Sequence, residues 1–345
     1  MRNTINMVLS FLKNNKGILA GIIASVLAVM FSLLPQLGNT IYANGLYQVI
    51  RVIIDNSLAL LPFPTIGIFL IALPFFLYFY FKKHYTTCRS LVVLPLNLIG
   101  GIIALFLVMW GYNYTHPNYF SQLYSREMTV TDLYEFGQNV VQSTNNSRLD
   151  SNGLSFSFDD NELRTSVESF CEEQNIPTIG RVQCKEIYLN GLMRKLGIAG
   201  IYMPFTGESY CDGTFPDVVK VFIKAHEMSH GYSVTDEGEA DYFAYKSLLA
   251  HSENYNFIYA ANLELLRSIR SQLYRINDSL RKELDTKISI EVMNDIKAIR
   301  ANALMHQEFI PGLQSEFNDK YLKMLGVTEG VKSYDRFVEI AWHNR

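Results

Sequence analysis

Two histidines and a glutamate have the spacing of a zinc-binding helix. His226 and His230 are four residues apart, and Glu227 directly follows the first of them. Side chains at i and i+4 lie on one face of a helix, so both imidazoles can reach one metal ion with Glu227 beside a metal-bound water. Residues 217–225 have apolar side chains at helical spacing, which predicts that the helix begins before the motif. The simpler interpretation is that both histidines are hydrogen-bonded residues of the core.

The third zinc ligand is expected soon after His230, because catalytic zinc usually has three protein ligands and one position open to water. A new helix is predicted from the acidic segment that begins at Asp236. Glu237 and Asp241 share one face of this helix, so we expect Glu237 to bind zinc and Asp241 to orient a histidine ligand. Glu239 is the alternative ligand, and its simpler role is that of capping-box partner to Asp236.

These residues predict a zinc peptidase with one Zn2+ per chain, held by His226, His230 and Glu237. Zinc would acidify its bound water and polarise the scissile carbonyl. Glu227 would take the proton of the water as general base and pass it to the leaving amine.

The elements that position this chemistry begin with three apolar runs. They cover about residues 17–34, 64–81 and 91–111, and each is close to the roughly 20 residues that a transmembrane helix needs. We therefore expect a membrane domain over residues 1–111, followed by a second domain over residues 112–345. The alternatives are that one run is a buried core helix or that the first run is a cleaved signal peptide.

Residues 41–54 are apolar but too short to cross a bilayer. They predict an amphipathic helix on the outer membrane surface or against the second domain. The orientation follows from basic residues, which favour the cytoplasmic side. They precede the first run and fill the loop between the second and third runs: Arg2, Lys13, Lys16, Lys82, Lys83 and Arg89. The N-terminus is therefore expected in the cytoplasm, and the second domain is expected outside the cytoplasmic membrane.

The second domain is predicted to be mostly helical with a small sheet. A short apolar stretch bounded by glycine and proline predicts a strand over residues 198–204, just before the metal helix. A loop is expected over residues 145–160. Helices are expected over residues 130–145, 161–174, 185–196, 239–250, 255–285, 289–306, 314–325 and 331–341.

Charge and cysteine usage argue against two kinds of site. The net charge of −3 over 345 residues gives no indication of nucleic-acid binding. The four cysteines, Cys88, Cys171, Cys184 and Cys211, form no C-x-x-C pair, so a structural cysteine–zinc site is not expected. Cys171 and Cys184 are expected either as a disulfide outside the cytoplasm or as two free thiols.

The order of the motifs resembles that of the gluzincin-type metallopeptidases, in which His-Glu-x-x-His is followed by Glu-x-x-Ala-Asp. A closer resemblance is to an uncharacterised bacterial family of membrane-anchored, zincin-like proteins known only as a domain of unknown function. The resemblance extends over nearly the whole chain. Beside the spans and the metal motifs it includes Trp-Gly-x-Asn-Tyr at 110–114, Gly-x-Tyr-x-Pro-Phe-Thr-Gly-Glu at 200–208, Tyr-Leu-Lys at 321–323 and Gly-Val-Lys-Ser-Tyr at 330–334. Asp241 stands where that family often has asparagine, a departure that does not threaten the metal site.

The resemblance implies a membrane-anchored α+β metallopeptidase with a zincin fold, and it supplies no substrate. Tyrosines are candidate donors to the oxyanion, and Tyr334 is favoured because it lies in a family-like segment; the others are Tyr202, Tyr242 and Tyr245. The strand at 198–204 would align an extended peptide by strand addition, as the edge strand does in zincins. Glu208 would either select a basic substrate residue or, as the simpler interpretation, be a solvated loop carboxylate.

The leading hypothesis is a zinc endopeptidase that cuts proteins or peptides at the outer face of the cytoplasmic membrane. Two alternatives keep the same zinc site: a membrane-bound zinc sensor or scaffold without turnover, and a zinc amidase that acts on cell-wall peptides. Glu227 counts against the sensor, since binding alone requires no general base. An intramembrane protease is disfavoured because His226 lies more than 100 residues after the last span. The expected partners are the lipid bilayer and a peptide or protein substrate.

Overall fold

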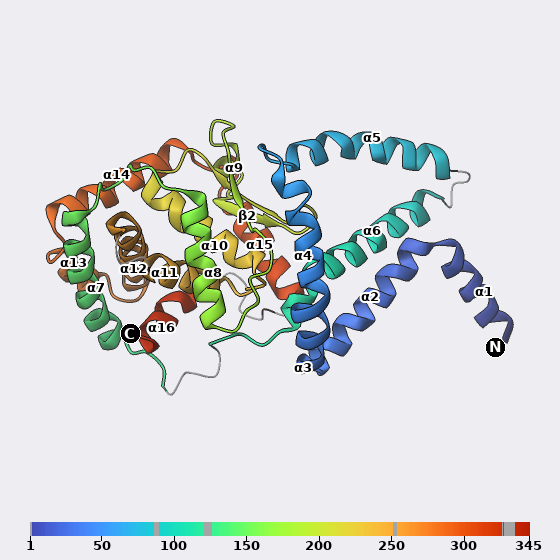
Figure 1. Ribbon diagram of the computed structural model, residues 1–345, viewed down its shortest axis with the longest axis horizontal. Coiled ribbons are helices and arrows are strands. Elements are labelled where there is room, and N and C mark those ends of the chain that lie inside the picture. The colour runs from blue at the N-terminus through green and yellow to red at the C-terminus, as the bar shows by residue number, and fades with distance from the viewer. Residues whose placement is uncertain (1, 86–89, 121–125, 251–253, 326, 328–334) are drawn as a thin grey trace. The chain divides into compact units, whose positions relative to one another are not determined.

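The structure is a computed structural model that describes residues 2–85, 90–120, 126–250, 254–325, 327 and 335–345 (Figure 1). It divides into two compact units. The N-terminal unit consists of Met1–Pro117 and Met203–Gly207, and the C-terminal unit consists of Asn118–Tyr202 and Glu208–Arg345. The described residues are mainly helical, with one three-stranded sheet.

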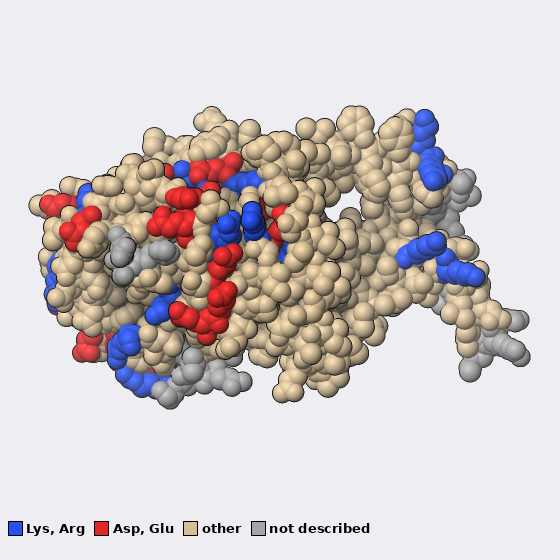
Figure 2. Space-filling model, viewed as in Figure 1, with Lys and Arg blue, Asp and Glu red and all other residues tan. Residues whose placement is uncertain are grey.

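Three helices of the N-terminal unit are long and apolar enough to cross a membrane: α2 (Lys16–Leu33), α5 (Ile66–His84) and Leu91–Met109 of α6 (Ser90–Met109). Few of their residues are buried, as in helices that are apolar all round and face lipid. Figure 2 shows charged side chains gathered over the C-terminal unit, while the visible face of the N-terminal unit is uncharged except for two basic groups at its far end. The three predicted apolar runs are therefore helices. The short helices α1 (Arg2–Asn14) and η3 (Gly111–Thr115) flank them.

Glycines bring α2 and α6 into close contact. A Cβ on Gly21 would lie 2.8 Å from Gly100 Cα, so the two backbones touch at this point. Asn97 Oδ1 accepts hydrogen bonds from the backbone N–H groups of Gly17, over 2.8 Å, and Ile18. Small residues let helices pack closely where no hydrophobic effect drives them together.

The segment between α2 and α5 is a series of short helices, of which α4 buries polar residues. It comprises α3 (Pro35–Gly38), the π-helix η1 (Asn39–Leu46), α4 (Tyr47–Asp55) and the 3-10 helix η2 (Leu58–Leu60). In α4, three polar residues are buried and three aliphatic residues are exposed: Gln48, Arg51 and Asp55 against Val49, Val52 and Ile53. Residues 41–54, expected as an amphipathic helix, thus expose an apolar side of the kind that contacts membranes.

The C-terminal unit is built around a buried helix, α10 (Asp217–Gly231), of whose 15 residues thirteen are buried. The elements that pack around α10 include helices α8 (Asp160–Glu173), α11 (Glu237–Ala250) and α12 (Tyr255–Ile276) and strand β3 (Glu208–Asp212). The helices of this unit are α7 (Val130–Asp150), α8 (Asp160–Glu173), α9 (Leu192–Lys195), α10, α11 (Glu237–Ala250), α12 (Tyr255–Ile276), α13 (Asp278–Asp285), α14 (Ile290–Met305), α15 (Leu313–Met324) and α16 (Arg336–His343).

The sheet has the strand order β1–β3–β2. β1 (Cys184–Ile187) is parallel to β3 (Glu208–Asp212), in a register that places Cys184 opposite Ser209. β2 (Gly200–Met203) therefore lies at one edge of the sheet, which confirms the strand predicted over 198–204. All of β3 is buried, because it is the central strand and packs against α10.

Three predicted boundaries are wrong. Residues 185–196 contain β1 and the short α9 instead of one helix, because β1 is stabilised by its pairing with β3, which no local pattern reveals. The helix predicted over 255–285 is two helices, since Asn277 accepts a hydrogen bond from the N–H of Leu280 and so begins α13. The loop predicted over 145–160 starts only after α7 ends at Asp150.

The described cysteines form no disulfide. Cys171, Cys184 and Cys211 are free, buried thiols, so Cys171 and Cys184 follow the second of the two expectations. Cys88 lies outside the described residues. Burial raises the pKa values of the Cys171 and Cys184 thiols well above their ordinary value, which keeps both uncharged.

Candidate metal centre

Helix α10 is held firmly by its surroundings. Asp217 lies in its first turn, where a carboxylate interacts favourably with the helix dipole. Val221 and Ala225 are completely buried, and Ser209 of β3 donates a hydrogen bond of 2.8 Å to the backbone carbonyl of Glu227. This packing fixes the second half of the helix, which contains the H-E-x-x-H motif, against the sheet.

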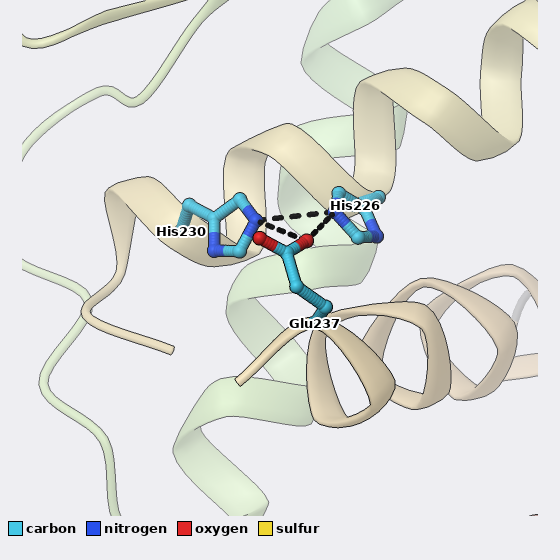
Figure 3. Close-up of side chains that lie close together, drawn as sticks. All are labelled: His226, His230 and Glu237. Carbon is cyan, nitrogen blue, oxygen red and sulfur yellow. Dashed lines mark hydrogen bonds and ion pairs between the residues drawn. The ribbon is translucent and has the colours of Figure 1, made fainter. Parts of the chain in front are cut away.

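Three side chains from α10 and the first turn of α11 converge on one point (Figure 3). The Nε2 atoms of His226 and His230 are 3.1 Å apart, and Glu237 Oε2 lies 3.2 Å from the first and 3.4 Å from the second. A tetrahedral zinc ion with bonds of about 2.0–2.1 Å holds its donor atoms about 3.3–3.4 Å apart. The three residues could therefore hold a metal ion, and their spacing fits a tetrahedral one.

The Nδ1 atom of each ring is held by an acceptor outside the group, so each Nε2 atom faces the other ring and Glu237. His226 Nδ1 donates to Asp241 Oδ1 over 2.7 Å, and His230 Nδ1 donates to the backbone oxygen of Val234 over 2.7 Å. Because both partners are acceptors, each neutral ring carries its proton on Nδ1 and directs an Nε2 lone pair toward Glu237. Two lone pairs and a carboxylate at these distances repel one another unless a proton or a metal ion lies between them.

The electrostatics of the site favour positive charge. Burial alone would lower the pKa of His226, but the Asp241 carboxylate outweighs it and raises that pKa well above its ordinary value. Burial would raise the pKa of Glu237, but His230 and His226 together lower it below its ordinary value. The negative field that favours a proton on His226 also favours a metal ion in place of that proton.

Glu239, the alternative third ligand, is bound elsewhere. Its Oε1 accepts a hydrogen bond of 2.8 Å from the backbone N–H of Phe120, and burial raises its pKa to about 7. The expected capping box is half formed: Asp236 Oδ1 accepts from the N–H of Glu239, while Arg336 binds the other oxygen of Asp236. The structure therefore brings Glu237, and not Glu239, to the two histidines.

Glu227 is buried near the metal-binding group, and a glycine makes room for it. Burial raises the pKa of Glu227 to about 7, against the opposing effect of His226 and His230. A Cβ on Gly200 would lie 2.6 Å from Glu227 Oε1, so the Gly200 Cα packs directly against the carboxylate. Gly200 is the first residue of the edge strand β2. Sequence reasoning missed this role, although Gly200 begins the Gly-x-Tyr-x-Pro segment of the family resemblance.

Two other residues that were predicted for the site, Tyr242 and Glu208, are not part of the metal-binding group. Tyr334 lies outside the described residues, and Tyr242 packs in the aromatic part of the core. Glu208 is completely buried on β3, where Lys185 binds it at 2.6 Å and Tyr210 donates to it. The expectation of a solvated loop carboxylate at Glu208 is wrong, because a lysine from the neighbouring strand compensates its charge in the interior.

Comparison with known proteins identifies the family of the chain. Residues 42–341 match the family model described as a protein of unknown function, DUF3810. No curated protein and no solved structure matches the chain. The match covers most of the chain, which confirms the expected membership of a family of unknown function. A zincin-like fold and peptidase activity stay predictions.

Proposed function

We propose that this chain, which belongs to the DUF3810 family, is a zinc-dependent peptidase. One observation carries the proposal: two imidazole nitrogens and a carboxylate oxygen converge at 3.1–3.4 Å, and the carboxyl group of Glu227 is buried near them. Hydrogen-bonded core histidines, the simpler interpretation, would need a protonated ring that donates its Nε2–H to Glu237, whereas one metal ion would engage all three donor atoms at once. The donor set of two histidines and one glutamate is one that catalytic zinc sites use.

The residues around the three donors would hold the metal in a fixed geometry. When bound, zinc supplies a Lewis acid that polarises the scissile carbonyl and lowers the pKa of water. His226, His230 and Glu237 would hold it, while Asp241 and the Val234 carbonyl keep the two rings in the required tautomer.

Glu227 would move the proton during hydrolysis. As the water attacks, a carbon–oxygen bond forms and Glu227 accepts a proton of the water. As the carbon–nitrogen bond breaks, the same carboxyl group gives that proton to the leaving nitrogen. The edge strand β2 would align an extended substrate, since its residue Gly200 lies against Glu227.

The hydropathy and the charge distribution support a location of the C-terminal unit, and of the proposed reaction, at the outer face of the cytoplasmic membrane. Helices α2, α5 and α6 are long and apolar enough to cross a membrane. Basic residues lie just before or at the start of α2 and at the end of α5, which favours the cytoplasm for those ends; they are Lys13, Lys16, Lys82 and Lys83. Three crossings would then place the C-terminal unit outside.

The test uses the full chain in detergent with a quenched-fluorescent peptide pool of degenerate sequence. Wild-type protein should cleave the pool, and a chelator should stop it. Glu227→Gln should lower the rate by at least about 10²-fold while zinc content stays unchanged. Glu173→Gln, at an exposed position of α8, is the matched control.

Three outcomes distinguish the hypotheses. Cleavage by Glu227→Gln at the wild-type rate would refute the proposal. Zinc in the wild-type protein without cleavage of any peptide would favour the zinc sensor. Cleavage of cell-wall peptides alone would favour the amidase.

A further inference from the structure

The turn between β2 and β3 belongs to the N-terminal unit. Met203–Gly207 clusters with the apolar helices, whereas the residues on either side belong to the C-terminal unit. The carbonyl oxygen of Gly207, whose φ is 65°, accepts a hydrogen bond of 2.8 Å from Arg51 Nη1. A Cβ on Gly207 would lie 2.5 Å from Ile54 Cγ2, so α4 packs directly against the turn.

The group that holds this turn is a buried ion pair. Arg51 and Asp55 are each 1% exposed, and Arg51 Nη2 lies 2.5 Å from Asp55 Oδ1. Asp55 compensates the charge of Arg51, while Nη1 binds Gly207. Charged residues buried among apolar helices are costly, so their presence here indicates a specific positioning role.

The same turn contacts a candidate membrane span. Phe205 stacks on Phe69, with ring centroids 6.2 Å apart and an interplanar angle of 4°. Phe69 is the fourth residue of α5, so the contact lies at the end where this helix begins. Successive spans cross a membrane in opposite directions. The start of α5 and the end of α6 are therefore on one side, from which the chain continues into the C-terminal unit.

The chain itself limits the distance between the reactive carboxylate and this contact. Gly200 packs against Glu227, and Phe205 follows five residues later. Five residues span at most about 18 Å when fully extended. The carboxylate of Glu227 therefore lies within about 22 Å of Phe205, a distance that an extended substrate covers with about seven residues.

We infer that the substrates are membrane-bound polypeptides, cut within about ten residues of the point where they leave the bilayer. This inference rests on the proposed peptidase function and narrows its substrate class. A segment that emerges from the same bilayer is present near β2 at high effective concentration, whereas a more distant segment of the same chain is not.

The test is a membrane-bound substrate pool. It consists of one apolar transmembrane helix followed by an outer tail of degenerate sequence, about 40 residues or ~130 Å long when extended. The pool and the full chain are reconstituted in vesicles of phosphatidylethanolamine and phosphatidylglycerol, and cleavage sites are mapped by mass spectrometry. We expect cuts to be at least about tenfold more frequent in the ten residues next to the helix than in the outer half of the tail. Cuts spread evenly along the tail would overturn the inference.

Two variants test the turn itself. Arg51→Met removes the donor to Gly207, and Phe205→Ala removes the stacking on α5 while it leaves the ion pair intact. Each should broaden the distribution of cuts and accelerate hydrogen exchange of the turn amides, with zinc content unchanged. An unchanged distribution and unchanged exchange in both variants would overturn the role of the turn.

Cleavage of the tail after its release from the transmembrane helix is a separate test of the proposed peptidase function. Wild-type protein should cut the released tail without a positional preference. Failure to cut either form of the pool would count against the peptidase proposal. Cleavage of the membrane-bound and the released tail at the same positions would overturn the inference of membrane-proximal selection. It would leave the peptidase proposal intact.

Discussion

Gly200→Ala should impair catalysis without loss of the metal. The added methyl carbon would lie 2.6 Å from Glu227 Oε1, 2.7 Å from Glu227 Cγ and 2.8 Å from Ile223 Cγ2. Favourable contacts between such atoms need about 3.5 Å, so strand and carboxylate must separate by roughly 0.7–0.9 Å. None of these three nearest atoms belongs to a proposed zinc ligand.

The expected loss follows from that displacement. A shift of about 1 Å in a catalytic group costs on the order of 10²-fold in rate, so we expect kcat to fall by about 10- to 100-fold. The overpacking should also lower the free energy of unfolding by about 1–3 kcal/mol. The assay is the initial rate on the degenerate peptide pool, with zinc measured by elemental analysis on the same sample.

Gly67→Ala is the matched control, because nothing lies within 4 Å of its Cβ position. It should keep both zinc and rate. A folded, zinc-loaded Gly200→Ala protein with the wild-type rate would refute the placement of Glu227 against β2. Loss of zinc together with activity would show that the methyl group disturbs the ligands rather than the general base.

Three further predictions concern the histidine ligands and the thiols. Asp241→Asn should weaken zinc binding about 10- to 100-fold in a chelator competition, because the amide holds the His226 ring without a full charge; an unchanged affinity would contradict this. Zinc affinity should rise with pH up to the raised pKa of His226, because a proton competes with the metal below that pKa and is absent above it; a flat pH profile would speak against His226 as ligand. In a Cys88→Ser background, the three buried cysteines should react with a thiol reagent only after unfolding, and rapid labelling of the native protein would disprove their burial.

The grouping of the candidate metal ligands could be predicted because local geometry determines it. Helix periodicity alone places His226 and His230 on one face, and the same periodicity separates Glu237 from Glu239 on the next helix. The i, i+4 relation also brings Asp241 to the same side, where it binds His226. The three apolar helices likewise follow from the length and composition of their runs.

Strand β1 could not be predicted, because its charged residues have partners from other elements. Lys185 pairs with Glu208 of β3, and Glu186 pairs with Lys220 and Lys224 of α10. Taken alone, these charges favour an exposed helix over a strand in a buried sheet.

The positioning roles of Gly200 and Arg51 also depend on residues that are distant in sequence. Gly200 meets the carboxylate of a residue on the following helix, and Arg51 donates to a carbonyl 156 residues away. Neither residue has a neighbour in sequence that indicates such a contact, so only the folded structure reveals it.

Elemental analysis of the full chain tests the central claim most directly. Wild-type protein and the matched variants Glu237→Gln and Glu239→Gln are dialysed against a weak chelator, then compared by zinc content and by helical circular dichroism. We predict about one zinc per chain in the wild type and in Glu239→Gln, and loss of zinc from a fully helical Glu237→Gln. A folded wild-type protein without zinc, or zinc kept by Glu237→Gln and lost from Glu239→Gln, would contradict the proposed metal centre.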